Sequence, residues 1–201
     1  MGIDESIQGR RSVRLLLGPP LPSEDVDALV ELAVTAPAPH HTQPWRFVDI
    51  GAARREGLAS AMGAAWREDL AGDGVSTAQQ DRLISRSRAQ IVDAPTLLLG
   101  CIVGEGLRDY PDETRRQSEW MLAVHSFGAA MQNILLAVAE RELGAYWISA
   151  PLYAPRAVRA ALDLPGEWVP QAFIAIGHPD PSYVTFNRPT PDLVRHLVRR
   201  S

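Results

Sequence analysis

The sequence predicts an α+β sandwich, a single domain over residues 1–201 in which helices flank one buried sheet. Helical and strand-like segments follow one another without the regular βαβ repeat of a parallel sheet. The glycine clusters at 72–74 and 104–106 match neither the dinucleotide-binding fingerprint nor a P-loop. The segment from Trp120 to Val138 is apolar on more than one helical face, which is typical of a core or interface helix.

The helices are predicted from apolar residues at helical spacing and from signals at their ends. Ser23 is a suitable N-cap for the first helix, in which Val26 and Leu29 share a face, and Pro37 ends it. The expected helices cover residues 23–36, the surroundings of 58–66, 77–91, 113–142 and 155–162.

The strands are predicted from short apolar or alternating runs between turn residues. The segment 46–50 alternates, and Pro95 breaks the preceding helix before the continuous apolar run 96–103, which reads as a buried strand. Two further short strands are expected at 146–149 and 172–176.

Composition is that of a globular chain, with 46% hydrophobic and 22% charged residues. The net charge of −4 provides no global positive field, so nucleic acid is not an expected partner. The single cysteine, Cys101, lies in an apolar run and is expected to be a buried thiol. Residues 1–5 show no signal peptide, and no uninterrupted apolar stretch reaches about 18 residues. The expected location is the cytoplasm, away from membranes.

The basic segment Arg10-Arg11-Ser12-Val13-Arg14 suits a phosphate, because guanidinium groups supply charged bidentate donors. In an extended segment, positions 10, 12 and 14 would point the same way. A solvated basic stretch near a terminus is the alternative, and the segment alone leaves both open.

A proline-stiffened loop from Pro37 to Pro44 leads into the first long strand and can present polar groups at little entropic cost. The adjacent His40 and His41 would diverge in an extended loop, and no further ligand stands at zinc spacing, so no metal is expected. The Gln43 amide has both a donor and an acceptor, so it could form hydrogen bonds with the polar edge of a ring.

Four segments in this order resemble the flavin-dependent nitroreductase family. They are the arginine segment 10–14, the block Pro37–Phe47 with Gln43-Pro44-Trp45, the joint Gly144–Ile148 and the strand end Ile176–Pro179. The resemblance implies a mixed or antiparallel sheet flanked by helices, in a domain-exchanged homodimer with FMN at the subunit interface. It also implies hydride transfer, with NAD(P)H as a possible donor.

Site residues follow from the same resemblance. Arg10, Arg11, Ser12 and Arg14 would hold the flavin phosphate and ribityl chain, and Arg188 would complete the phosphate site. Backbone around Trp147, Ile148 and Ser149 would face the reactive edge of the ring. The residues expected to approach the flavin from the other subunit are Pro37, Ala38, Pro39 and His41.

The string Thr35-Ala36-Pro37-Ala38-Pro39-His40-His41-Thr42 narrows the resemblance. It is similar to the C-terminal nitroreductase-like domain of the actinobacterial bifunctional protein that completes the deazaflavin coenzyme F-420. The implied reaction is FMN-dependent reduction of a dehydro precursor of that coenzyme. A general nitro or quinone reductase and a non-catalytic deazaflavin-binding module are the alternatives.

Two expectations concern catalysis and substrate access. His41 and Tyr110 are the candidates for proton supply, and no side-chain acid or base is strictly required for hydride transfer. The segment 104–116 is expected to form a lid. Arg82, Arg86 and Arg88 would lie near its opening or on a solvated helix face.

Overall fold

The computed structural model describes residues 2–200, which build one five-stranded sheet. Its strands are β1 (Leu16–Leu17), β2 (Trp45–Asp49), β3 (Thr96–Ile102), β4 (Gly144–Ile148) and β5 (Val169–Pro179). Every ladder is antiparallel: β2 pairs with β3, and β5 pairs with β3, β4 and β1. The predicted α+β sandwich with an antiparallel sheet is confirmed.

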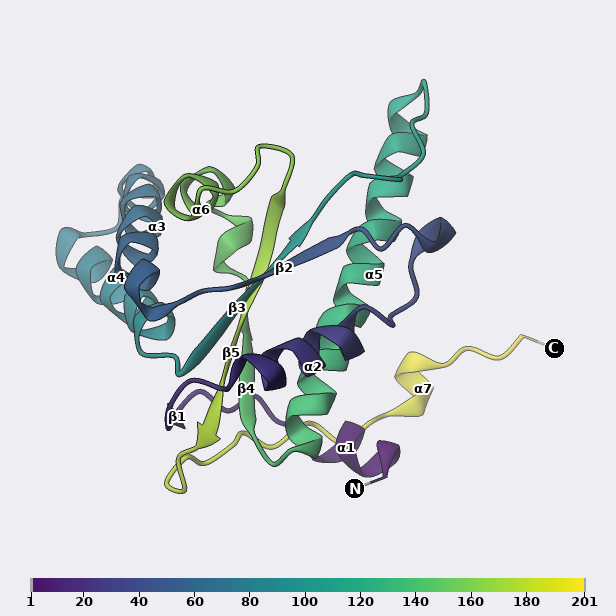
Figure 1. The fold of residues 1–201 in the computed structure, drawn as a ribbon, viewed down its shortest axis with the longest axis horizontal. Coiled ribbons are helices and arrows are strands. Elements are labelled where there is room, and N and C mark those ends of the chain that lie inside the picture. The colour runs from purple at the N-terminus through teal and green to yellow at the C-terminus, as the bar shows by residue number, and fades with distance from the viewer. Residues whose placement is uncertain (1, 201) are drawn as a thin grey trace.

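Helices cover both faces of this sheet (Figure 1). One face carries α2 (Ser23–Ala33) and α5 (Glu113–Glu140), and the other carries α3 (Ala52–Gly72), α4 (Thr77–Val92) and α6 (Pro155–Leu162). Because side chains alternate along a strand, Leu98 packs towards α5 while its neighbours Leu97 and Leu99 pack towards α3. The continuous apolar run in β3 therefore serves two cores.

The α5 helix is long and apolar enough to cross a membrane by length and composition alone. Its buried residues, among them Ala123, Phe127 and Met131, belong instead to the core on the α2 side of the sheet. The packing against β3, β4 and α2 accounts for the buried part of its apolar surface.

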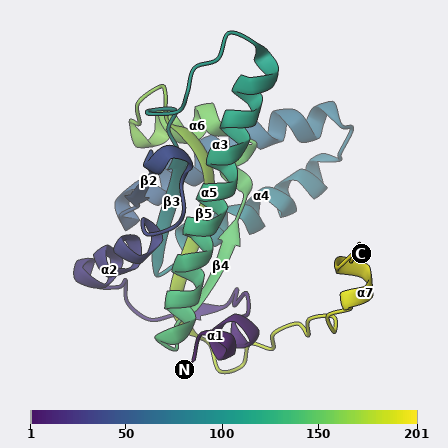
Figure 2. The same cartoon turned by 90° about the vertical axis from the view of Figure 1, so that its right-hand side faces the viewer.

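Several short elements were not predicted: α1 (Ile3–Gly9), β1, the 3₁₀ turns η1 (Pro39–His41) and η2 (Ala150–Leu152), and α7 (Leu193–His196). Each is too short to show a period in the sequence. The predicted strand at 172–176 extends over eleven residues in β5, because its flanks pair with β3 and β1. Beyond β5 the chain runs beside the N-terminal segment as far as Arg188. Both views show α7 standing apart from the body of the molecule (Figures 1 and 2).

Candidate functional site

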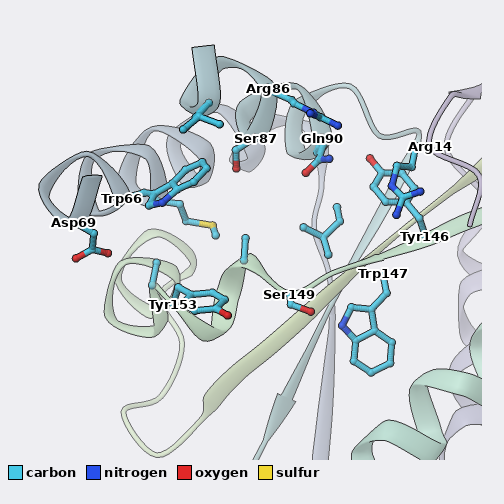
Figure 3. A pocket seen from close by; sticks show the side chains of 15 residues that line it. Arg14, Trp66, Asp69, Arg86, Ser87, Gln90, Tyr146, Trp147, Ser149 and Tyr153 are labelled. Carbon is cyan, nitrogen blue, oxygen red and sulfur yellow. The ribbon is translucent and has the colours of Figure 1, made fainter. Parts of the chain in front are cut away.

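A cavity of about 580 Å³ lies between β4, the helices α3 and α4, and the segment from η2 to Ala154. Figure 3 shows its side chains, which come from elements far apart in the sequence. It is lined by Arg14, Met62, Trp66, Asp69, Leu83, Arg86, Ser87, Gln90, Tyr146, Trp147, Ile148, Ser149, Ala150, Tyr153 and Ala154. A volume in this range accommodates a ligand of cofactor or drug size.

Four residues expected from the sequence meet in this cavity: Arg14, Trp147, Ile148 and Ser149. The strand alternation of β4 aims Tyr146 and Trp147 to opposite sides (Figure 3). The Trp147 ring meets Phe127 of α5 edge to face, with ring centroids 6.1 Å apart. Packing on that side fixes the strand, so its backbone at residues 147–149 forms a rigid wall of the cavity.

One end of the cavity is cationic. Arg14 and Arg86 both line it, beside the Ser87 hydroxyl and the Gln90 amide. None of the ion pairs found between residues 2 and 200 involves either arginine. Burial raises the pKa of Tyr146 to about 12, against the opposing effect of the nearby Arg14 charge. The phenol therefore keeps its proton and remains a hydrogen-bond donor.

A second group of cations lies outside this cavity, where Arg10, Arg11 and Arg188 come together. Arg188 donates to the carbonyl oxygens of Ile7, at 3.1 Å, and of Arg10. Burial lowers the pKa of the Arg10 guanidinium, and the charges of Arg188 and Arg11 lower it further. The buried Arg10 Nε has no hydrogen-bond partner among residues 2–200. An anion such as a phosphate would supply that missing acceptor and offset the mutual repulsion, so these residues fit one.

The two groups are joined through β4. The N–H of Val13 donates to the carbonyl oxygen of Ala145 at 3.0 Å, and Ser12 forms a parallel bridge with Ala145. The arginine segment thus runs beside β4. Arg10 and Arg14 do not point the same way, as the extended-segment argument expected: Arg10 lines a smaller cavity of about 300 Å³ with Arg11, and Arg14 lines the larger one.

The proline-stiffened loop does not contribute to either cavity within one chain. Its residues Pro37, Ala38, Pro39, His41 and Gln43 are absent from both linings. The loop contacts α5, on the other face of the sheet from α3 and α4. The Gln43 amide donates to the carbonyl oxygen of Val34 at 3.3 Å.

Tyr110 is likewise outside both cavities, and the guanidinium of Arg115 lies over its ring, 4.8 Å from the centroid. Of the three helical arginines, Arg86 faces the larger cavity, whereas Arg88 pairs with Glu56. Within residues 2–200 no group of three or more His, Cys, Asp or Glu side chains is placed to share a metal ion.

Most of the residues that line the cavity opposite β4 were not predicted as site residues from the sequence. Trp66 served only as one of the apolar residues that predict its helix, whereas in the structure it is half-buried and lines the cavity. The pair Met62 and Trp66, four residues apart on α3, was the available signal. Tyr153, 81% exposed just after η2, gave no pattern at all.

The chain belongs to the nitroreductase family, whose model matches residues 7–178. This family assignment makes the chain an oxidoreductase of the nitroreductase type. A relative from Rhodospirillum rubrum, 5,6-dimethylbenzimidazole synthase, is 30% identical to it over 96% of this chain and 87% of its own length. That name differs from the deazaflavin-coenzyme protein that the sequence motifs resemble.

Solved structures show the same fold. A BluB-like flavoprotein from Clostridium difficile superposes with a TM-score of 0.76 at 24% identity, covering 100% of this chain and 99% of its own. A nitroreductase from Desulfovibrio desulfuricans, solved in complex with FMN, superposes with a TM-score of 0.73 at 24% identity, covering 100% of this chain and 98% of its own. The FMN-dependent nitroreductase NfnB from Mycobacterium smegmatis, in complex with NADPH, superposes with a TM-score of 0.74 at 20% identity, covering 98% of this chain and 97% of its own.

Proposed function

We propose that this oxidoreductase transfers hydride to a planar, anionic heteroaromatic substrate, and that a dehydro precursor of the deazaflavin coenzyme is that substrate. The main support is the cationic end of the larger cavity, which is also lined by aromatic side chains. Arg14 and Arg86 lie at that end, and neither forms an ion pair with a carboxylate among residues 2–200. A stacked ring with an acidic tail matches both features.

FMN would be held at two places. Arg10, Arg11, Ser12 and Arg188 would take the phosphate, since the buried Arg10 Nε lacks an acceptor. The ring would lie in the larger cavity against the backbone of residues 147–149, with Arg14 beside it. Bound there, FMN would supply the hydride chemistry.

The residues of the chain contribute binding and orientation. The protonated Tyr146 phenol can donate a hydrogen bond within the cavity. The Trp66 and Tyr153 rings offer flat apolar faces that exclude water from a stacked ligand. His41 and Tyr110 remain candidates for proton supply, and both would have to act across a subunit interface or after movement of the loop.

The active unit is proposed to be a homodimer. Apolar side chains are exposed on α5, with Met121 51% and Leu122 45% accessible, and along the C-terminal segment, with Phe186 81% and Val194 89% accessible. A second copy of the chain would cover them. The same arrangement would bring the loop at residues 37–43 to the partner's flavin, which accounts for its distance from the cavity of its own chain.

A specific observation favours a second function. The similarity to the 5,6-dimethylbenzimidazole synthase of Rhodospirillum rubrum spans nearly the whole chain. Formation of 5,6-dimethylbenzimidazole is therefore the rival activity, beside general nitro or quinone reduction with NAD(P)H as the donor.

The test begins with the purified protein, which should be yellow and carry one FMN per chain. Calorimetry should then show binding of the deazaflavin coenzyme or its dehydro precursor that weakens as salt rises, whereas small neutral nitroaromatics should bind poorly. Reduction of the precursor by the FMN-loaded enzyme, with NAD(P)H supplied as the hydride donor and oxidised to NAD(P)+, would support the proposal. Rapid quinone turnover without deazaflavin binding, or formation of 5,6-dimethylbenzimidazole, would replace it with the corresponding rival.

A further inference from the structure

A buried carboxylate on α5 joins two loops that sequence analysis treated separately. The Glu119 side chain is only 6% exposed. Its Oε1 accepts a hydrogen bond from the backbone N–H of Arg108, at 3.2 Å, and lies 3.4 Å from Nε2 of His40. Burying a carboxylate is costly unless polar partners compensate it, so these two contacts are what make the position tolerable.

The loop that His40 belongs to needs external support. His40, His41 and Gln43 all adopt left-handed backbone conformations, with φ of 53°, 57° and 49°. Residues other than glycine take up this region at an energetic cost, and they keep it only where surrounding contacts hold them. Glu119 provides such a contact from a rigid helix.

The second loop packs directly on the first. A side chain at Gly106 would come within 3.1 Å of Thr42 Cγ2, and Gly106 itself has a φ of +78°. Arg46 and Glu105 form an ion pair at 2.7 Å, and the N–H of Val103 donates to the carbonyl oxygen of Pro44 at 3.1 Å. The segment 37–46 therefore contacts the segment 103–108 at three points, and Glu119 contacts both segments.

We infer that Glu119 is a positioning residue that holds these two loops as one unit and thereby sets the place of His41 and Gln43. A change in the segment 104–108 then displaces the segment 37–43 as well. The part of this inference that concerns the flavin rests on the proposed function, in which the second segment reaches the partner's cofactor. The coupling between the loops stands on the contacts alone.

Four variants test the coupling by hydrogen exchange of backbone amides. Glu119→Met removes the acceptor at similar size and should speed exchange in both segments by about tenfold, the effect of one lost hydrogen bond. Glu119→Gln keeps the oxygen that serves both contacts and should restore protection. Glu113→Met, on the same helix but with a side chain 64% exposed, is the matched control and should change neither segment. Gly106→Ala disturbs the contact with Thr42 and should speed amide exchange in both segments.

The exchange of α4 amides, on the other face of the sheet, is the control for a general loosening of the fold and should stay unchanged in all variants. Visible circular dichroism of bound FMN supplies the second readout: Glu119→Met should alter the band shape and lower kcat, with FMN affinity and KM within about twofold of wild type. Loosening of a single segment, or a flavin spectrum identical to that of Glu113→Met, would overturn the inference. A wild type that binds no FMN would overturn the proposed function instead, while the exchange data would still decide whether Glu119 couples the loops.

Discussion

The ring of Phe127 fills the space that a side chain at Gly100 would need. A Cβ at Gly100 would lie 2.6 Å from both Cε2 and Cζ of that ring. Phe127 reaches this position on β3 from α5, and the same ring makes the edge-to-face pair with Trp147 of β4. The absence of a side chain at residue 100 thus allows α5 to approach the sheet behind the cavity wall.

Gly100→Ala should therefore destabilise the protein. Because the core is close-packed, an added methyl group at this point forces the ring or the backbone to move, at a cost of about 1–3 kcal/mol. Urea unfolding measures the change. Gly57→Ala is the matched control, since nothing lies within 4 Å of its Cβ position on the exposed side of α3. It should stabilise the helix by about 0.5–1 kcal/mol.

Arg10→Ala and Arg14→Ala should affect flavin binding differently. Arg10 belongs to the proposed phosphate group, so its loss should weaken FMN binding by about 1.5–3 kcal/mol and leave riboflavin nearly unaffected. Arg14 lines the ring cavity, so its loss should weaken both flavins alike. Fluorescence titration of the apoprotein with each flavin measures this. Equal losses for both flavins in Arg10→Ala would contradict the phosphate assignment.

Stability should fall in alkali because of the buried thiol. Burial raises the pKa of Cys101 from 9.0 to about 12. Above pH 9 the unfolded chain releases this proton while the folded chain retains it, so the free energy of unfolding decreases as pH rises from 9 towards 12. Cys101→Ala should flatten this decline between about pH 8 and about pH 9.5. The buried Tyr146, whose pKa is also raised to about 12, adds its own loss of stability mainly above about pH 10. Urea unfolding at the two pH values is the measurement, and an unchanged slope would refute the assignment.

Light scattering of the FMN-loaded protein at micromolar concentration should give the mass of a dimer. Phe186→Asp places a charge where a partner is proposed to cover an apolar side chain, and it should weaken the dimer by at least about 2 kcal/mol. Gln79→Asp, at an exposed polar position of α4, should leave the mass unchanged. A monomer with FMN bound would refute the homodimer.

The longer elements could be predicted because each carries either an apolar period or a continuous apolar run. The helix at 155–162 was predicted with the bounds it has, from Pro155 at its start. The buried strand at 96–103 was located by its apolar run and by the break at Pro95. The short elements β1 and η1 depend on pairing and packing with distant residues, which a local pattern does not record.

Site residues could be predicted only where a local sequence pattern indicated their chemical role. The arginine segment and the joint after α5 were found, because charged clusters and a glycine-ended helix stand out in a sequence. That Arg10 and Arg14 serve different cavities depends on the bridge between Ser12 and Ala145, which links residues more than a hundred positions apart. The role of Glu119 could not be predicted, because a single carboxylate in an apolar helix does not indicate which residues it contacts.

The topology of β5 has a consequence for synthesis of the chain. This strand, Val169–Pro179, is the common partner of β1, β3 and β4, and it is the last strand to leave the ribosome. Until it emerges, β4 has no ladder partner and the apolar face of α5 has only part of its sheet to pack on. Nascent chains that end before residue 169 should therefore expose unpaired strand edges and depend on chaperones. Folding would be completed late, when most of the polypeptide has already been made.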